Sequence, residues 1–215
     1  MIDISRALEA VQREVGDGQL EARAAKVIRL RREYPAPIED VWDALTNPER
    51  IGRWFLPISG DYRLGGRYQF EGNAGGQILA CERPNLLKVS WIFGEGADPN
   101  GSFVEVHLAP AGDEATTLEL IHTAVVPDEM WTVFGPGAVG VGWEGGLLGL
   151  ELHLGGGSID DPIAWQISDE GRDFNKRSSA AWGEASRAAG VDEETILRNV
   201  ASTNGFYAPE PEAVS

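Results

Sequence analysis

His122 is the side chain with the clearest potential for chemistry inside an apolar interior. In the segment 116–125, Leu118, Leu120 and His122 alternate with other residues and therefore share one face of a predicted strand. An imidazole exchanges protons near neutral pH and forms hydrogen bonds in its neutral form. Two roles stay open for His122: a core histidine bonded to a neighbour, or a polar anchor and acid/base group in a ligand cavity.

Glu82 is the second candidate for acid/base chemistry. It points to the same side as Ile78 and Ala80, whereas Leu79 and Cys81 point to the other side of the predicted strand. Both sides carry apolar residues, so both orientations of Glu82 stay open.

Four aromatic residues from four different predicted elements lie on the apolar sides of those elements. We expect them to converge with His122, either as an ordinary aromatic core or as the lining of a cavity for an apolar ligand. The predicted ligand-binding residues are Trp54, Phe70, Trp91, His122 and Trp143.

Other catalytic motifs are not supported. The glycines within residues 140–145 match a dinucleotide-binding pattern, but that pattern works only at a turn from strand to helix. Here it lies inside a predicted helix, with Trp143 on the apolar face. The histidines are too dispersed for metal-ligand spacing, so the sequence predicts no metal and no cofactor. These histidines are His107, His122 and His153.

Composition limits the partners and the compartment. Asp and Glu outnumber Lys and Arg by 34 to 18, and the net charge of −16 predicts no binding to nucleic acid or to anionic membranes. A single cysteine, Cys81, cannot form an internal disulfide, which favours a reducing cytoplasm. The start of the chain has no apolar signal core, and the charge-free stretch 131–143 is shorter than the ~20 apolar residues of a membrane helix.

Two short helices are predicted between residues 37 and 55. Pro37 suits a first helical position, and the apolar residues that follow it fall on one helical face. Asn47 is a candidate N-cap, with Pro48 and Glu49 in the first turn of the second helix.

A strand at 26–32 precedes these helices, and a series of strands follows them. The expected result is an antiparallel sheet of six to seven strands rather than alternating βαβ units. The later strands are predicted at residues 58–64, 67–71, 77–83, 86–93, 103–108 and 116–125.

A long helix is predicted at 139–154. Its interior glycines would lower its stability in isolation. They indicate either close approach of the helix to the sheet or a mobile lid over a cavity. The apolar face of this helix carries Trp143, Leu147, Leu150 and Leu154.

Additional helices are expected at both ends of the chain. An N-terminal helix is predicted within residues 1–18, because apolar residues recur at helical spacing from Ile4 to Val15. Beyond the central domain, 19–157, a helical extension spans 158–207 with N-caps at Ser168 and Asp192, and a loose tail follows at 208–215. The extension is expected to pack on its own domain or to form a homodimer contact. Its two aromatic residues near one face are Phe174 and Trp182.

This order of elements resembles the α+β helix-grip fold of the START-like superfamily, which includes polyketide cyclases and birch-allergen-like proteins. The resemblance covers residues 26–154. Within the superfamily, the chain is similar to the branch of activators of the ninety-kilodalton heat-shock protein ATPase. A further segment, 182–190, resembles a C-terminal extension of actinobacterial members. The residues that carry the resemblance are Tyr34-Pro35-Ala36-Pro37, Asn47-Pro48-Glu49-Arg50, Trp54-Phe55 and Trp182-Gly183-Glu184-Ala185.

The resemblance implies a ligand cavity between sheet and long helix. Binding of an apolar or aromatic small molecule is therefore our first functional hypothesis. A cyclase-like or other small-molecule enzyme using His122 with Glu82 is the second. A co-chaperone-like protein interaction is the third.

Overall fold

The computed structural model describes residues 2–210. Residues 211–215, most of the predicted loose tail, lie outside the described residues. Within the described part, Ala208 is buried rather than loose. The elements are α1 (Ile4–Glu9), β1 (Gln12–Leu20), β2 (Arg23–Tyr34), α2 (Ile38–Thr46), α3 (Pro48–Trp54), β3 (Ile58–Gly60), β4 (Arg67–Phe70), β5 (Gly75–Glu82), β6 (Leu86–Ser90), β7 (Ser102–Pro110), β8 (Thr116–Ala124), α4 (Asp128–Phe134), α5 (Gly137–Leu154), α6 (Pro162–Ile167), α7 (Asp169–Ala188) and α8 (Glu193–Tyr207).

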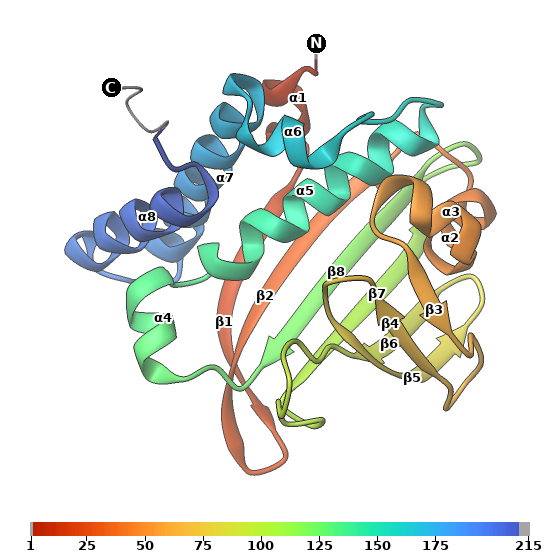
Figure 1. The fold of residues 1–215 in the computed structure, drawn as a ribbon, viewed down its shortest axis with the longest axis horizontal. Helices are drawn as coiled ribbons and strands as arrows, with labels where there is room; N and C mark the ends of the chain where they lie inside the picture. Colours follow the sequence, from red (N-terminus) through yellow and green to blue (C-terminus); the bar gives the residue numbers. More distant parts are fainter. Residues whose placement is uncertain (1, 211–215) are drawn as a thin grey trace.

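The strands form one antiparallel sheet that curves around the long helix α5 (Figure 1). Its strand order is β1-β2-β8-β7-β6-β5-β4-β3. The helices α2 and α3 connect β2 to β3, as the resemblance to the helix-grip fold implies. The predicted fold class is therefore confirmed, with eight strands instead of six to seven.

The additional strand is β1. The N-terminal helix predicted within residues 1–18 is shorter than expected, because β1 occupies the second half of that range. The helix α1 ends at Glu9, and β1 then pairs with β2 along its whole length, from Gln12 opposite Arg31 to Leu20 opposite Arg23. A spacing of four residues, as between Val11 and Val15, puts side chains on one face of a strand as well as of a helix. Pairing with β2 satisfies the backbone groups on one side of β1 over its whole length, so the strand is the stable alternative here.

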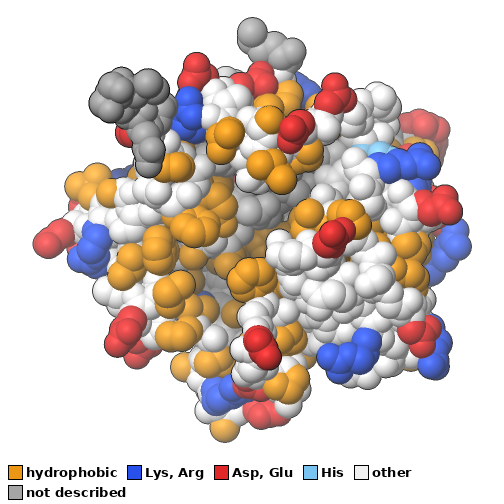
Figure 2. Space-filling model, in the orientation of Figure 1, with side chains coloured by type: hydrophobic (Ala, Val, Ile, Leu, Met, Phe, Trp, Pro, Cys, Tyr) orange, Lys and Arg blue, Asp and Glu red, His pale blue; other side chains and the backbone are white. Residues whose placement is uncertain are grey.

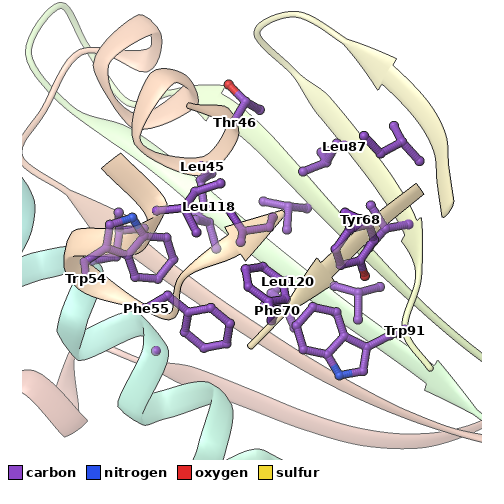
Figure 3. Close-up of a pocket in the computed structure, with 18 of the residues that line it drawn as sticks. Leu45, Thr46, Trp54, Phe55, Tyr68, Phe70, Leu87, Trp91, Leu118 and Leu120 are labelled. Carbon is purple, nitrogen blue, oxygen red and sulfur yellow. The ribbon is translucent and has the colours of Figure 1, made fainter. Parts of the chain in front are cut away.

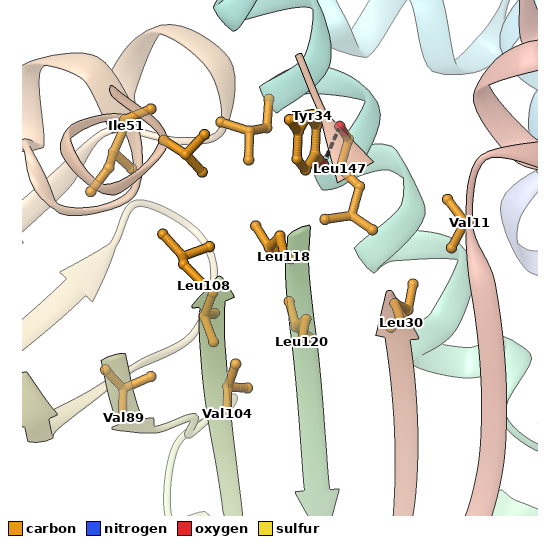
Figure 4. Close-up of a cluster of buried hydrophobic side chains, with 14 of the residues drawn as sticks. Val11, Leu30, Tyr34, Ile51, Val89, Val104, Leu108, Leu118, Leu120 and Leu147 are labelled. Carbon is orange, nitrogen blue, oxygen red and sulfur yellow. Dashed lines mark hydrogen bonds between the residues drawn. The ribbon is translucent and has the colours of Figure 1, made fainter. Parts of the chain in front are cut away.

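The two predicted helices after β2 are confirmed. Asn47 Oδ1 accepts a hydrogen bond from the backbone N–H of Glu49 at 3.1 Å, and Pro48 occupies the first turn of α3. The short chain between α2 and α3 turns the apolar side of α3, with Ile51, toward the sheet. Figure 4 shows Ile51 above the side chains of β6, β7 and β8.

The core lies between the sheet and α5. Figure 4 shows Leu147 of α5 facing residues of β8 and β2, such as Leu118 and Leu30. The Tyr34 hydroxyl at the end of β2 donates to the carbonyl oxygen of Leu147 at 3.0 Å and so links the sheet to α5. Burial raises the pKa of the Tyr34 hydroxyl, which keeps it a neutral donor.

The glycines of α5 permit close contact with other helices, rather than with the sheet as we expected. A Cβ on Gly140 would lie 2.2 Å from Cε2 of Trp182 in α7, and one on Gly149 would lie 2.5 Å from the carbonyl oxygen of Trp54 in α3. The extension therefore packs on α5 of its own domain. The extension contains α6 in addition to the helices expected after the N-caps Ser168 and Asp192, and α8 ends at Tyr207. None of the helices in the described residues is long and apolar enough to cross a membrane.

Gly140→Ala should destabilise the fold, whereas Gly145→Ala should stabilise it. An added methyl at residue 140 overlaps the buried indole of Trp182, and overpacking of this kind costs about 1–3 kcal/mol. A methyl at residue 145 meets no atom within 4 Å, so the better helix propensity of alanine contributes about 0.5–1 kcal/mol. Urea unfolding of the two variants measures both effects, and equal effects would contradict the packing described for Gly140.

Candidate functional site

A cavity of about 150 Å³ lies between the sheet, α3 and α5. An apolar cavity of about this volume in another protein binds benzene. Figure 3 shows side chains from α2, α3 and several strands pointing toward this space. The lining residues are Leu45, Thr46, Ile51, Trp54, Phe55, Ile58, Tyr62, Tyr68, Phe70, Ile78, Cys81, Leu87, Val89, Trp91, Val104, Val106, Leu118, Leu120, Trp143, Gly146, Leu147 and Leu150.

Aromatic rings make up much of the cavity wall. The four predicted aromatics, Trp54, Phe70, Trp91 and Trp143, all line it. Trp91 and Trp143 pack with ring centroids 4.8 Å apart, which joins the sheet to α5 at one end of the cavity.

Sequence reasoning missed three further aromatic residues, Phe55, Tyr62 and Tyr68. The signal for Tyr68 was present, because it lies two residues before Phe70 and so shares its face of β4. Phe55 follows the last residue of α3, and its ring meets Phe70 edge-on at 4.9 Å. No strand or helix period predicts the direction of a side chain at such a position.

Within residues 2–210, the cavity wall contains no charged side chain, and several of its polar groups are bonded within the protein. The Trp54 indole donates to the Ala44 carbonyl at 3.0 Å. The Tyr68 hydroxyl donates to the Ser90 carbonyl at 2.8 Å. Burial of an ion without a partner is strongly unfavourable, so the site suits an uncharged ligand.

The cavity lies near a hollow on the surface. Figure 2 shows hydrophobic side chains gathered around a depression in the middle of this face, beside the position of α5 in Figure 1. This arrangement is typical of a pocket that an apolar molecule can enter.

His122 is buried beside the cavity, outside its lining. The indole N–H of Trp143 donates to His122 Nδ1 at 3.1 Å, and His122 Nε2 lies 2.8 Å from Ser102 Oγ. Because Nδ1 accepts, the ring proton is on Nε2 and is donated to the serine. His122 thus contacts Trp143, as expected from its face of β8, but Trp143 lines the cavity and His122 does not.

Glu82 is exposed and does not line the cavity. The pairing of β5 with β6 is irregular between Ile78 and Ala80. Ile78 lines the cavity before the irregularity, and Cys81, although exposed, lines it after the irregularity. This bulge explains why a strict alternation could not place Glu82.

His122 should make stability depend on pH. Burial lowers its pKa from 6.5 to about 4, so the unfolded chain takes up a proton at higher pH than the folded protein does. The stability due to neutral His122 is complete above about pH 6.5 and is lost as the pH falls toward 4, by about 3 kcal/mol in total.

Urea unfolding between pH 7 and 4 measures this loss. The matched control is His122→Asn, which has no titrating ring but retains an acceptor. The wild type should lose more stability than the variant over this range. Parallel curves would contradict the assigned protonation state.

Comparison with known proteins identifies the family. The profile of the family described as "Activator of Hsp90 ATPase homolog 1-like protein" matches residues 35–155, a little over half of the chain. The chain belongs to this family. Among functionally curated proteins, no significant match is found.

Similarity to solved structures extends beyond the part of the chain that the profile matches. CalU16 from Micromonospora echinospora is 35% identical in its crystal structure, with a TM-score of 0.66 over 82% of this chain and 98% of CalU16. Its solution structure is 34% identical, with a TM-score of 0.68 over 83% and 96% of the two chains. DynU16 is 25% identical, with a TM-score of 0.50 over 60% of this chain and 47% of DynU16.

Proposed function

We propose that this activator-like protein binds an uncharged aromatic or apolar small molecule in the cavity between the sheet and α5. The observation that carries the proposal is the wall itself. It combines seven aromatic residues with aliphatic ones and has no charged group. Burial of one large apolar side chain contributes about 1.5–3 kcal/mol, and an aromatic ligand of similar size would gain a comparable amount in this site.

One similar protein supports a small-molecule role. DynU16 is described as a putative protein in the dynemicin biosynthetic locus.

A cyclase-like activity using His122 and Glu82 is less well supported. His122 does not line the cavity, both of its ring nitrogens have partners, and Glu82 is exposed. A general acid or base must reach the reacting atoms directly or through one water. For a co-chaperone role, no described contact provides specific support beyond the family description.

A binding titration tests the proposal. We expect 1-naphthol to quench the tryptophan emission saturably with one site per chain. The anionic analogue 1-naphthoate should bind at least about tenfold more weakly, because the wall has no cation to pair with it.

The variant Val104→Phe provides the control. Val104 is 3% exposed and lines the cavity, so a larger ring at this position fills the space a ligand needs. Binding of 1-naphthol should be lost in a folded Val104→Phe protein. Absence of saturable binding by the wild type, or unchanged binding by this variant, would contradict the proposal.

A further inference from the structure

Ser102, His122 and Trp143 form a hydrogen-bonded row that runs from β7 through β8 to α5. The two distances are 2.8 Å from Ser102 Oγ to His122 Nε2 and 3.1 Å from His122 Nδ1 to Trp143 Nε1. The imidazole and indole rings meet edge to face, at an interplanar angle of 89°. The row is buried at its centre, where His122 is 5% exposed.

The Trp143 indole donates its N–H to His122 Nδ1. It is the last member of the row and also part of the cavity wall, where it packs on Trp91. On the surface of α5, the residues three positions before and after Trp143, Gly140 and Gly146, have no side chains that could support the indole. Val139, four positions before it, is 40% exposed.

We infer that His122 is a positioning residue that holds the Trp143 indole as one wall of the cavity and thereby limits the size of the ligand. The inference rests on the proposed function. With the acceptor at Nδ1 removed, the indole N–H loses its partner, and other rotamers of Trp143 become competitive. The cavity then extends into the space that the indole leaves.

The test compares two uncharged probes that carry the same hydroxyl group on ring systems of different size, 1-naphthol and 1-pyrenol. The wild type should prefer 1-naphthol by at least about tenfold. His122→Leu removes the acceptor, and Trp143→Phe removes the donor. Each should reduce the preference to about threefold or less, and the double variant should show no further change, because both substitutions break the same bond.

Two further variants separate positioning from general stability. His122→Asn places an amide oxygen where Nδ1 accepts, so it should retain the preference of the wild type. His107→Leu removes an imidazole from the neighbouring strand β7, where His107 Nε2 lies 3.3 Å from Glu105 Oε2. This variant should also leave the preference for 1-naphthol unchanged. General loosening of the fold would instead weaken the binding of both probes together.

The outcomes distinguish this inference from the proposed function. If the wild type binds neither probe, the proposed function is wrong. If the wild type binds 1-naphthol and the preference persists in folded His122→Leu, the inference is wrong and the binding function stands. Should His122→Leu fail to fold, Trp143→Phe decides, and an unchanged preference in that variant overturns the inference.

Discussion

A chain truncated after Gly157 is expected to lose most of its stability. The missing helices, α6 to α8, contain two aromatic side chains, Phe174 and Trp182, that are each 1% exposed in the full protein. Each contributes about 1.5–3 kcal/mol through burial. Together they contribute about 3–6 kcal/mol, which is comparable with the whole stability of many domains.

The contacts of α5 explain why the loss is large. Trp182 lies against Gly140, and Phe174 packs in a second cluster with Leu148 and α1. Truncation would expose these surfaces and also one side of the carboxylate of Glu144, which is 2% exposed.

Thermal melting and sedimentation of the truncated and full-length proteins test this account. We expect a strongly lowered Tm or the absence of a cooperative transition. An unchanged Tm would contradict it. A folded truncated monomer derived from a full-length dimer would instead support the homodimer contact, the second of the two alternatives expected for the extension.

Arg13→Leu is expected to destabilise the protein by about 3–5 kcal/mol. Arg13 of β1 contacts both carboxylate oxygens of Glu144, with Nε 2.6 Å from Oε1 and the other donor 2.9 Å from Oε2. Burial raises the pKa of Glu144, and the hydrogen bond from Arg13 opposes that rise. Removal of one member of a buried pair leaves the other charge without compensation.

The pH dependence and two controls make this prediction specific. A carboxyl group whose pKa is raised in the folded state makes the protein more stable when it is protonated. The loss of stability caused by Arg13→Leu should therefore shrink as the pH falls. Adding Glu144→Leu should recover much of the lost stability, because no buried charge remains. Arg6→Ala should cost at most about 1 kcal/mol, because the Arg6 side chain is 67% exposed in its pair with Glu151. Equal effects of Arg13→Leu and Arg6→Ala in urea unfolding would contradict the account.

Capping residues and apolar spacing correctly predicted those helices whose formation does not depend on residues distant in the sequence. Asn47 and Pro48 mark the start of α3 through capping chemistry that acts within one turn. The apolar spacing from Trp143 to Leu154 predicted α5 in the same way. The sequence did not predict β1, because this segment is a strand only through its pairing with β2. The spacing of its apolar residues fits a helix as well as a strand.

The site was predictable only in part, for a similar reason. The faces of Phe70 and Trp143 follow from strand and helix periods, and both residues line the cavity. The exclusion of His122 from the wall depends on the size and direction of the Trp143 indole, and the direction of Glu82 depends on a bulge. The pair of Arg13 with Glu144 joins residues 131 apart, and no local pattern reports such a contact.

The indole N–H resonances of the seven tryptophans provide the most direct test of ligand binding in this cavity. A ¹⁵N–¹H spectrum of the full chain, titrated with 1-naphthol, reports on each indole separately once single substitutions have assigned them. We predict saturable shifts for Trp54, Trp91 and Trp143, which line the cavity, and unchanged positions for Trp165 and Trp182, which pack elsewhere. A spectrum in which the three lining indoles stay fixed at saturating 1-naphthol, or in which only Trp165 or Trp182 shifts, would contradict binding in this cavity.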